Sequence, residues 1–246
     1  MSNSKTKTAF ITGGGKGIGA AIVKSLVKGD NNVIFTYSSS EEQAKRLVDE
    51  LATQSNHVTA IKMDVADAAQ VKSVIEQVGD QFGTIDILVN NAGVFKESAF
   101  SALASEDFDW MIDVNLKGAF LTALYAQKYI PEGGRIVTIG STVADITPGK
   151  GNTLYATSKS GLQGFTRGLA RDLGEKGITV NLVQPGPVDT DMNPADAPFA
   201  DFIRSRMAIP KYGQPQDIAA LVNFLTSAEA QYITGSIITI DGGFNA

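Results

Sequence analysis

Residues 12–19 read Thr12-Gly13-Gly14-Gly15-Lys16-Gly17-Ile18-Gly19, and no other stretch says as much about the chain. Apolar residues 9–11 precede it and the alternating apolar segment 20–27 follows it, which is the order strand, glycine turn, helix. Such glycines let a backbone approach a pyrophosphate, whose charge the first N–H groups of the helix and its dipole hold. The spacing is G-x-x-x-G-x-G rather than G-x-G-x-x-G or a P-loop, so a turn that only packs a helix on a strand is an open alternative.

Short β-branched runs alternate with longer amphipathic stretches along the rest of the chain. The expected strands are residues 8–12, 32–37, 58–63, 85–90, 134–140, 178–184 and 236–241. The expected helices are residues 17–28, 41–54, 67–82, 106–129, 153–176 and 215–226. The strands are apolar throughout, as in sheets with helices on both faces. Right-handed β-α-β connections then predict an α/β fold, a doubly wound parallel sheet of seven strands in one domain over residues 1–246.

One segment, residues 189–213, interrupts this pattern with three prolines, two phenylalanines and two methionines. It is too apolar for a solvated loop and too irregular for a core helix, so we expect a substrate lid. Arg204 and Arg206 in this segment either guide an acidic substrate or are surface charges on a lid helix. Apolar residues that line the substrate pocket or belong to the core are Phe95, Val143, Leu154, Met192, Phe199, Phe202 and Met207.

Composition excludes several classes of function. The net charge is −5 and no run of Lys or Arg occurs, which argues against a nucleic-acid partner. The chain has no cysteine, so disulfides, thiolate zinc sites and cysteine nucleophiles are excluded, and we expect no metal site. The single histidine, His57, favours a surface role, which leaves Ser-His-Asp catalysis without a base. The polar residues 1–7 and the lack of a long apolar run predict a soluble, cytoplasmic protein that binds no membrane.

Tyr155 and Lys159 are four residues apart at the start of an expected helix, so their side chains share one face. This spacing is weak evidence alone, but the preceding strand brings Ser141 to the same rim as the glycine turn. A phenol titrates near pH ~10, and a nearby ammonium favours the phenolate and moves its pKa toward working pH. We therefore expect Tyr155 to transfer a proton while Ser141 donates a hydrogen bond to a substrate carbonyl.

Two further asparagine signals belong to this rim. Asn90-Asn91-Ala92-Gly93 ends the fourth expected strand, where amides and a glycine would line a cofactor cleft. Asn115 lies inside the expected helix 106–129, where asparagine is a poor helix former. Propensity alone favours a solvent-facing or locally bonded Asn115 side chain.

Taken in order, the motifs of this chain resemble those of the short-chain dehydrogenase/reductase superfamily in its compact form of roughly 250 residues. The resemblance covers nearly the whole chain, and its closest-looking subgroup includes 3-oxoacyl-carrier reductases and cyclic-di-GMP-binding biofilm-dispersal proteins. The motifs that carry it are Thr12-(x)3-Lys16-Gly17-Ile18-Gly19, Asp64-Val65, Asn90-Asn91-Ala92-Gly93, Asn115, Ser141, Tyr155-(x)3-Lys159, Pro185-Gly186-Pro187-Val188-Asp189-Thr190 and Tyr232-Ile233-Thr234-Gly235 followed by Asp241-Gly242-Gly243. The family's usual Ser-Ser pair is Gly140-Ser141 here, which leaves the catalytic serine intact.

The resemblance implies a Rossmann fold and a role for each matching residue. Tyr155 is the general acid–base, and Lys159 binds the nicotinamide ribose and tunes the tyrosine. Ser141 positions the carbonyl, and Asn115 holds a water of a proton relay. Asp64 would meet the adenine amino group. The remaining cofactor-binding residues that it implies are Gly13, Gly15, Lys16, Gly17, Ile18, Gly19, Tyr37, Ser38, Val65, Asn90, Ala92, Gly93, Pro185, Gly186, Val188 and Thr190.

The end of the second expected strand bears on the choice of nicotinamide cofactor. Family members that prefer NAD commonly carry an acid there, whereas this chain has Tyr37 followed by three serines. Lys16 and serine hydroxyls could meet a 2′-phosphate, although Glu41 and Glu42 in the next turn would repel it. The sequence favours NADP(H), with NAD(H) tolerated.

Two functions from different classes follow from the resemblance. The first is a ketone or aldehyde reductase, which in reverse is a secondary-alcohol dehydrogenase, acting on a small-molecule substrate. The second is a cyclic-di-GMP sensor, suggested by residues 131–136, 163–172 and 183–191, although a sensor has no need of an acid–base tyrosine. The resemblance also implies a homotetramer, in which Leu116, Phe120, Leu124, Leu162, Phe165 and Leu169 serve either an interface or the core.

Overall fold

One parallel sheet organises the computed structural model, which describes residues 6–29, 31–52 and 57–246. The strand order is β3-β2-β1-β4-β5-β6-β7, and every neighbouring pair is parallel. The strands are β1 (Thr8–Ile11), β2 (Asn32–Tyr37), β3 (Val58–Lys62), β4 (Ile87–Asn90), β5 (Arg135–Ile139), β6 (Thr179–Pro185) and β7 (Ile237–Ile240). The order reverses between β1 and β4, so the doubly wound prediction is confirmed, and such sheets bind ligands beyond that switch point.

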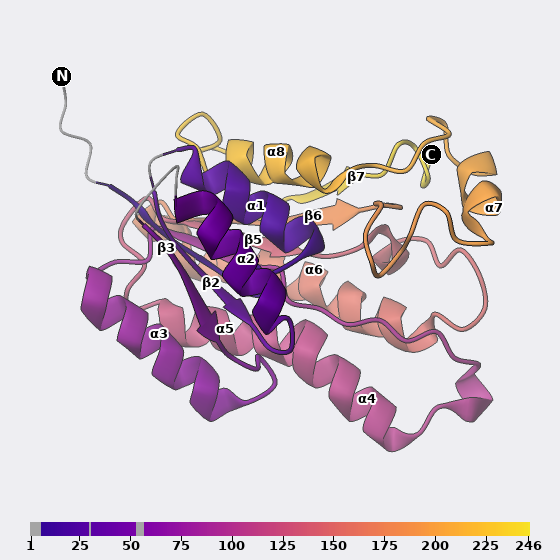
Figure 1. Cartoon of the computed structure of the whole chain (residues 1–246), viewed down its shortest axis with the longest axis horizontal. Helices are drawn as coiled ribbons and strands as arrows, with labels where there is room; N and C mark the ends of the chain where they lie inside the picture. Colours follow the sequence, from indigo (N-terminus) through magenta and orange to yellow (C-terminus); the bar gives the residue numbers. More distant parts are fainter. Residues whose placement is uncertain (1–5, 30, 53–56) are drawn as a thin grey trace.

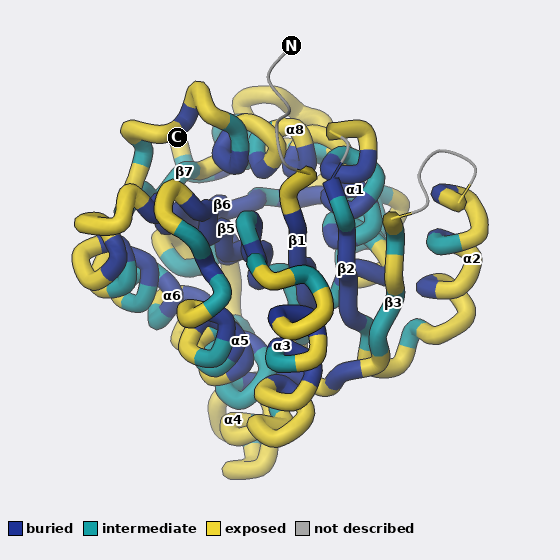
Figure 2. Tube along the Cα trace, turned by 90° about the vertical axis from the view of Figure 1, so that its left-hand side faces the viewer, coloured by how far each residue is buried: buried dark blue, intermediate teal, exposed yellow. Residues whose placement is uncertain are grey.

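Helices cover both faces of the sheet (Figure 1). On one face α1 (Gly17–Val27), α2 (Glu41–Ala52) and α8 (Pro215–Leu225) share a core cluster with the strands. On the other face the second cluster joins α3 (Ala68–Phe82), α5 (Gly118–Ala126) and α6 (Thr153–Leu173). Figure 2 shows the central strands buried between these layers, which is why their sequences are apolar on both faces.

The expected helix 106–129 is interrupted in the structure. It consists of α4 (Ser105–Ile112), a π-helical turn η2 (Asp113–Lys117) and α5. The expected helix 153–176 is α6 followed by the 3-10 turn η4 (Gly174–Lys176). The last two residues of the expected helix 41–54, like residues 1–5, lie outside the described residues. Two more 3-10 turns, η1 (Phe100–Ala102) and η3 (Thr142–Ala144), follow β4 and β5.

The two ends of the segment expected to form a lid, residues 189–213, lie next to each other. Val188 pairs with Gly213 in an isolated bridge, and Thr190 pairs with Asn193. The short helix α7 (Ala200–Ser205) lies between Asn193 and Gly213 in the chain and projects from the body of the molecule (Figure 1). Across the described ranges, none of the helices has both the length and the apolar character needed to cross a membrane. His57 is exposed next to β3, the edge strand, in agreement with the surface role expected for it.

Candidate active site

Ser141, Tyr155 and Lys159 meet at the carboxyl end of β5. Ser141 caps the turn η3 directly after this strand, and its Oγ accepts a hydrogen bond of 3.2 Å from the Val143 N–H. The Ser141 hydroxyl also hydrogen-bonds to the phenol of Tyr155, in the first turn of α6. Lys159 lies one turn further along α6, where its Nζ donates to the Ile139 carbonyl at 3.1 Å and lies 5.8 Å from the centre of the Tyr155 ring. The structure therefore brings the three residues together, as the sequence predicts.

The electrostatics of this cluster differ from the expectation. Although part of the Tyr155 residue stays exposed, burial around its hydroxyl raises the pKa to about 12, and the Ser141 hydrogen bond opposes this only in part. Burial also lowers the pKa of Lys159 to about 8. The prediction that the amine makes the phenol acidic is thus wrong for the protein alone, because desolvation disfavours the phenolate more strongly than its neighbours favour it. The cluster holds a protonated phenol at neutral pH.

Asn115 is buried, at 1% exposure, and lies within the π-helical turn η2. Its Oδ1 accepts from the Val94 N–H at 2.8 Å, while its Nδ2 donates to the Val94 carbonyl and to Ser158 Oγ. The solvent-facing or local reading favoured by propensity is therefore wrong, because distant partners override it. Turns of this kind occur frequently at functional sites. Since protein groups use both polar atoms of the side chain, its role in a proton relay stays a prediction.

Ser158 is a site residue that the sequence reasoning missed. It is fully buried on α6, accepts from Asn115 Nδ2 at 3.0 Å and donates to the Tyr155 carbonyl at 2.8 Å. It therefore links the π-helical turn to the backbone of Tyr155. The available signal was its place three residues after Tyr155, on the same helix face.

The glycine turn forms a cradle with no room for side chains. Gly13 has φ of +65°, and a Cβ there would lie 2.9 Å from the Ala92 Cα. A Cβ on Gly19 would lie 2.2 Å from the Gly13 carbonyl oxygen. Gly17, with φ of +54°, faces Thr190, whose Cγ2 would lie 3.5 Å from an added Cβ. These positions require glycine for close backbone approach and a left-handed conformation.

Thr12 and Asn91 tie this cradle to the loop after β4. The Thr12 hydroxyl accepts from the N–H groups of Asn91 and Ala92 at 3.0 and 3.1 Å. Asn91 Nδ2 in turn donates to the carbonyls of Thr12 and Gly13. Of the two neighbouring asparagines, Asn91 thus braces the turn, whereas Asn90 is buried and reaches Thr138 Oγ1 at 3.4 Å. The sequence motif contains Asn91, but its spacing alone does not predict this bracing role.

The start of α1 fits a nucleotide pyrophosphate. Its N-cap, Lys16, is extended and makes no side-chain capping hydrogen bond, so the first N–H groups have no side-chain acceptor from the cap. Such uncapped groups, at the positive end of the helix dipole, favour an anion. Gly15 lies against Ser40, whose Oγ would be 2.8 Å from an added Cβ. The residues at this helix start therefore fit the pyrophosphate of a dinucleotide.

The charges near the end of β2 bear on a 2′-phosphate. Tyr37 is half-buried, whereas Ser38 and Lys16 are exposed. Glu41 pairs with Lys45 at 2.7 Å and Glu42 with Arg46 at 3.1 Å. Each carboxylate expected to repel a phosphate is therefore paired with a cation one turn along α2, and this pairing lowers the electrostatic repulsion that a 2′-phosphate would meet.

The other expected cofactor residues line the same edge of the sheet. Asp64 is exposed and its Oδ1 accepts from the Ala66 N–H, while Val65 is buried against Gly118. A Cβ on Gly93 would lie 3.4 Å from both Asn115 Oδ1 and Lys159 Nζ. Beyond β6, which ends at Pro185, the chain turns at Gly186 and passes through Val188 to Thr190, next to the glycine cradle.

The apolar pocket candidates separate into two groups. Phe95 contacts Tyr155 edge-on, with ring centres 4.9 Å apart and planes at 82°. Met192, Phe199 and Phe202 are exposed, and Val143 is partly buried. Met207 is instead buried, next to Gly242. Leu154 is buried too, and it lines a cavity of about 390 Å³ with Phe100 and Phe108.

Arg204 is held within the segment expected to form a lid, residues 189–213. It pairs with Asp201 at 2.6 Å, donates to the Ala195 carbonyl and stacks 5.3 Å over the ring of Tyr212. Arg206 stacks 5.9 Å over Phe202. These contacts favour the interpretation of Arg204 as a structural residue of the lid rather than a guide for an acidic substrate.

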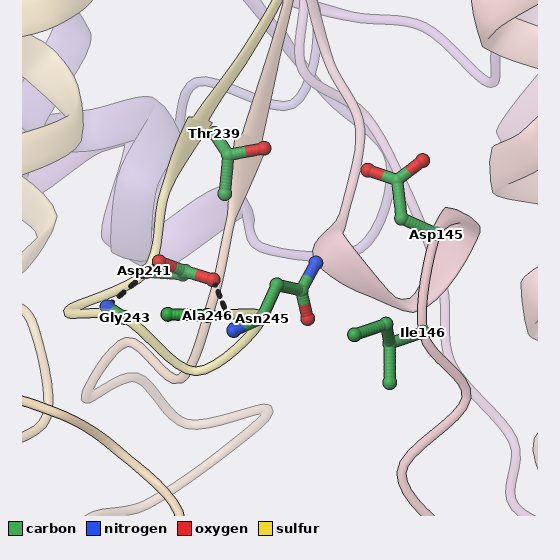
Figure 3. Close-up of a pocket in the computed structure, with 7 residues that line it drawn as sticks. All are labelled: Asp145, Ile146, Thr239, Asp241, Gly243, Asn245 and Ala246. Carbon is green, nitrogen blue, oxygen red and sulfur yellow. Dashed lines mark hydrogen bonds between the residues drawn. The ribbon is translucent and has the colours of Figure 1, made fainter.

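An open pocket of about 430 Å³ lies between the chain just after the turn η3 and the C-terminal segment (Figure 3). Asp145 and Ile146 line one side, and the C-terminal segment lines the other through Asp241, Gly243, Asn245 and Ala246. Asp241 Oδ1 and Oδ2 accept from the N–H groups of Gly243 and Asn245. Ser141 and Tyr155 do not line this cavity, so the cavity is separate from the reacting groups.

Comparisons with known proteins agree with this geometry. A model of the enoyl-(acyl carrier protein) reductase family matches residues 13–245. The chain is 45% identical over 240 residues, 98% of each chain, to the cyclic-di-GMP-binding biofilm dispersal mediator protein of Escherichia coli (strain K12). It is 38% identical to a 3-oxoacyl-[acyl-carrier-protein] reductase of Staphylococcus aureus (strain Mu50), covering 97% of this chain and 98% of the relative. The crystal structure of a short chain dehydrogenase from Burkholderia cenocepacia J2315 in complex with NADP superposes with a TM-score of 0.96, at 47% identity over 98% of both chains.

Proposed function

Because this chain belongs to the short-chain dehydrogenase/reductase family, we propose that it is an NADP(H)-dependent reductase of ketones and aldehydes. The observation that carries the proposal is the Tyr155 phenol, hydrogen-bonded to Ser141 and one helical turn from Lys159. This group lies at the edge of the sheet where the glycine cradle also ends. A proton donor next to a dinucleotide site is what carbonyl reduction needs.

The residues of the cradle support NADP(H) as the cofactor. The uncapped start of α1 suits the pyrophosphate, and exposed Lys16 and Ser38 suit a 2′-phosphate. Pairing of Glu41 and Glu42 with cations of α2 lowers the repulsion that such a phosphate would meet. The related dehydrogenase from Burkholderia cenocepacia, crystallised with NADP, supports the same choice. We expect NAD(H) to be tolerated.

The protein's own residues account for the proton and the orientation of substrate. When bound, the reduced nicotinamide supplies the hydride. Ser141 and Tyr155 hydrogen-bond to the carbonyl oxygen, and Tyr155 then delivers its proton there. The phenol is in its acid form at neutral pH, as a proton donor for reduction must be. Lys159, held by the Ile139 carbonyl, lies within reach of a ribose hydroxyl on the same side.

A medium-sized apolar or aromatic substrate fits the surroundings of Tyr155. Phe95 stands edge-on to the phenol, and Met192, Phe199 and Phe202 lie exposed on or beside the lid. Apolar side chains left exposed at a catalytic rim gain contact area when an apolar ligand binds. The net charge of −5 also favours a small-molecule substrate, in the cytoplasm, over nucleic acid or an anionic membrane surface.

A screen of carbonyl compounds with both reduced cofactors tests the proposal. Purified protein is mixed with aryl ketones, aliphatic ketones, aldehydes and 3-oxoacyl thioesters, and loss of nicotinamide absorbance is followed. We expect turnover with apolar ketones or aldehydes and a higher kcat/KM for NADPH than for NADH. A strong preference for NADH would overturn the cofactor assignment, and no oxidation of either cofactor across the panel would overturn the reductase.

A sensor of cyclic-di-GMP is the second candidate, and one observation favours it. The relative from Escherichia coli that is named for this activity shares 45% identity over 98% of its length. Titration of cyclic-di-GMP by calorimetry, run beside the carbonyl screen, separates the two functions. Binding without any cofactor oxidation would favour the sensor, whereas oxidation without binding would exclude it.

We also propose that the protein assembles as a homotetramer. On α5, Phe120 is 51% exposed and Leu124 is 43% exposed, whereas Leu162 on α6 belongs to the core at 1%. Phe120 also contacts Phe165 of α6, with ring centres 5.8 Å apart, so the two helices present a joined apolar face. Light scattering after gel filtration should give a tetramer, and Leu124→Glu should yield smaller species. A wild-type monomer would contradict the assembly.

A further inference from the structure

Gln184 is fully buried at the end of β6, and its side-chain amide is held from two other elements. Its Nε2 donates to Asp145 Oδ2 at 2.5 Å, and its Oε1 accepts from Gln163 Nε2 at 3.0 Å. Gln163 Nε2 also donates to Asp145 Oδ1 at 2.6 Å. The three side chains thus form a closed ring, in which the carboxylate accepts from both amides.

The ring connects the elements that carry the reacting groups. Asp145 is the C-cap of the turn η3, and Ser141 is its N-cap. Gln163 lies on α6, one turn after Lys159 and two turns after Tyr155, while Gln184 is anchored in the sheet. A buried amide is costly to leave unpaired, so Gln184 strongly favours the positions of Asp145 and Gln163 that satisfy it. The relative position of Ser141 and Tyr155 is thereby constrained.

Gly140, directly before Ser141, packs closely against the same stretch of β6. A Cβ on Gly140 would lie 3.2 Å from Leu182 Cδ1 and 3.4 Å from Gln184 Cγ. Leu182 therefore occupies most of the space that a side chain before Ser141 would need, and the stem of Gln184 lies at contact distance beside it.

We propose that Asp145, Gln163 and Gln184 are positioning residues, which fix the Ser141 hydroxyl against the Tyr155 phenol. The proposal rests on the proposed function in that this pair acts on a carbonyl. Two other hydrogen bonds also hold the turn, from Ser160 Oγ to the Ala144 carbonyl and from Asn245 Nδ2 to the Thr142 carbonyl. Variants of these three residues should therefore keep the fold, but the Ser141 hydroxyl should be held less precisely against the Tyr155 phenol.

The test exchanges acceptor and donor within the ring. Asp145→Asn sets an NH2 group against the Gln184 NH2 group and breaks the match. In Asp145→Asn/Gln184→Glu the carboxylate moves to position 184, where it accepts from the amides at 145 and 163, and the ring is restored. Gln163→Met removes both of its hydrogen bonds at similar volume. Asp172→Asn, an exposed site on the same helix, is the control for loss of one negative charge.

We expect Asp145→Asn and Gln163→Met to lower kcat about tenfold, with NADPH affinity close to wild type. Both variants should also melt a few degrees lower than wild type, because the buried Gln184 amide loses a partner. The double variant should recover most of this loss, and Asp172→Asn should match wild type. Wild-type kcat in both single variants would overturn the proposal. So would a double variant that folds and is no faster than Asp145→Asn. If the double variant does not fold, the two single variants decide.

Hydrogen exchange supplies a readout that needs no substrate. The Val143 amide donates to Ser141 Oγ, so its protection reports directly on the position of the serine. It should exchange at least about fivefold faster in Asp145→Asn and slow again in the double variant. If the wild type reduces no carbonyl, the proposed function fails while this measurement still decides the ring. Equal exchange rates of the Val143 amide in wild type and Asp145→Asn would overturn the proposal that the three side chains position Ser141.

Discussion

Lys159 donates a hydrogen bond of 3.1 Å to the carbonyl of Ile139, the last residue of β5, although the lysine itself is buried on α6. Its hydrogen-bond partner is a neutral group, which compensates a buried ammonium only in part. The same contact holds the amine near Gly93, where an added Cβ would lie 3.4 Å from Lys159 Nζ. The structure thus holds the amine in a buried position that disfavours its charged form.

This cost predicts how stability depends on pH. Burial lowers the pKa of Lys159 to about 8 in the folded protein, from 10.5 ordinarily. Above the folded pKa the native state has released a proton that the unfolded chain still binds, so the free energy of unfolding rises with pH. The rise begins near pH 8 and ends near pH 10, above which the raised pKa of Tyr155, about 12, acts in the opposite direction.

Urea unfolding of Lys159→Met measures this contribution. The variant should be more stable than wild type near neutral pH, by at most about 3 kcal/mol, and should lose most of the rise with pH. Both proteins are compared without cofactor. An identical pH profile in the two proteins would contradict the buried charge.

Removal of the Asn115 side chain should weaken the fold as well as the site. Asn115→Ala leaves the Val94 N–H, the Val94 carbonyl and Ser158 Oγ without this partner in a buried region. We expect a loss of about 2–3 kcal/mol in unfolding free energy. Asn223→Ala, exposed on α8, is the control and should change little. A loss no larger than that of the control would show that the π-helical turn does not depend on Asn115.

The glycine cradle predicts a position-specific effect of a single methyl group. Gly19→Ala brings a Cβ to 2.2 Å from the Gly13 carbonyl oxygen, so the turn must move. NADPH affinity should fall at least about tenfold, as expected for displaced phosphate-binding groups. Gly164→Ala on α6 meets nothing within 4 Å and should leave affinity unchanged. Fluorescence titration measures the NADPH affinity of both variants. Equal affinities of Gly19→Ala and Gly164→Ala would contradict the role of the glycine cradle in cofactor binding.

Lys16 should determine the preference between the two cofactors. Loss of a charge-assisted contact to a 2′-phosphate costs about 1.5–3 kcal/mol, so Lys16→Ala should lower kcat/KM for NADPH about 10- to 100-fold. The value for NADH, which lacks this phosphate, should change by less than about threefold. Lys28→Ala, an exposed lysine at the opposite end of α1, serves as the charge control. A parallel loss with both cofactors would assign Lys16 to another part of the dinucleotide.

The sequence alone predicts the strands of the described sheet and the edge of the sheet where their carboxyl ends meet. Apolar runs mark all seven strands, and the helix start at Asp67 shows its cap, which accepts from the N–H groups of Ala69 and Gln70. Tyr155, Lys159 and Ser141 follow from local spacing and from the rule that ligands bind at strand carboxyl ends.

Two features of the site depend on tertiary contacts that no local pattern carries. Propensity describes Asn115 on an isolated helix, whereas Val94 and Ser158 decide its burial. The spacing of Tyr155 and Lys159 indicates attraction between charge and phenol, but the sign of the pKa shift depends on desolvation, which only the packed structure gives. The ring of Asp145, Gln163 and Gln184 joins a turn, a helix and a strand with no shared spacing.

The rate of NADPH oxidation by Tyr155→Phe, measured with the best carbonyl of the screen, tests the account most directly. The variant keeps the aromatic ring of residue 155 and loses only the hydroxyl that Ser141 contacts. We predict a fall in kcat of at least about 1,000-fold, with NADPH affinity within about threefold of wild type. Turnover near the wild-type rate would contradict the assignment of Tyr155 as the proton donor.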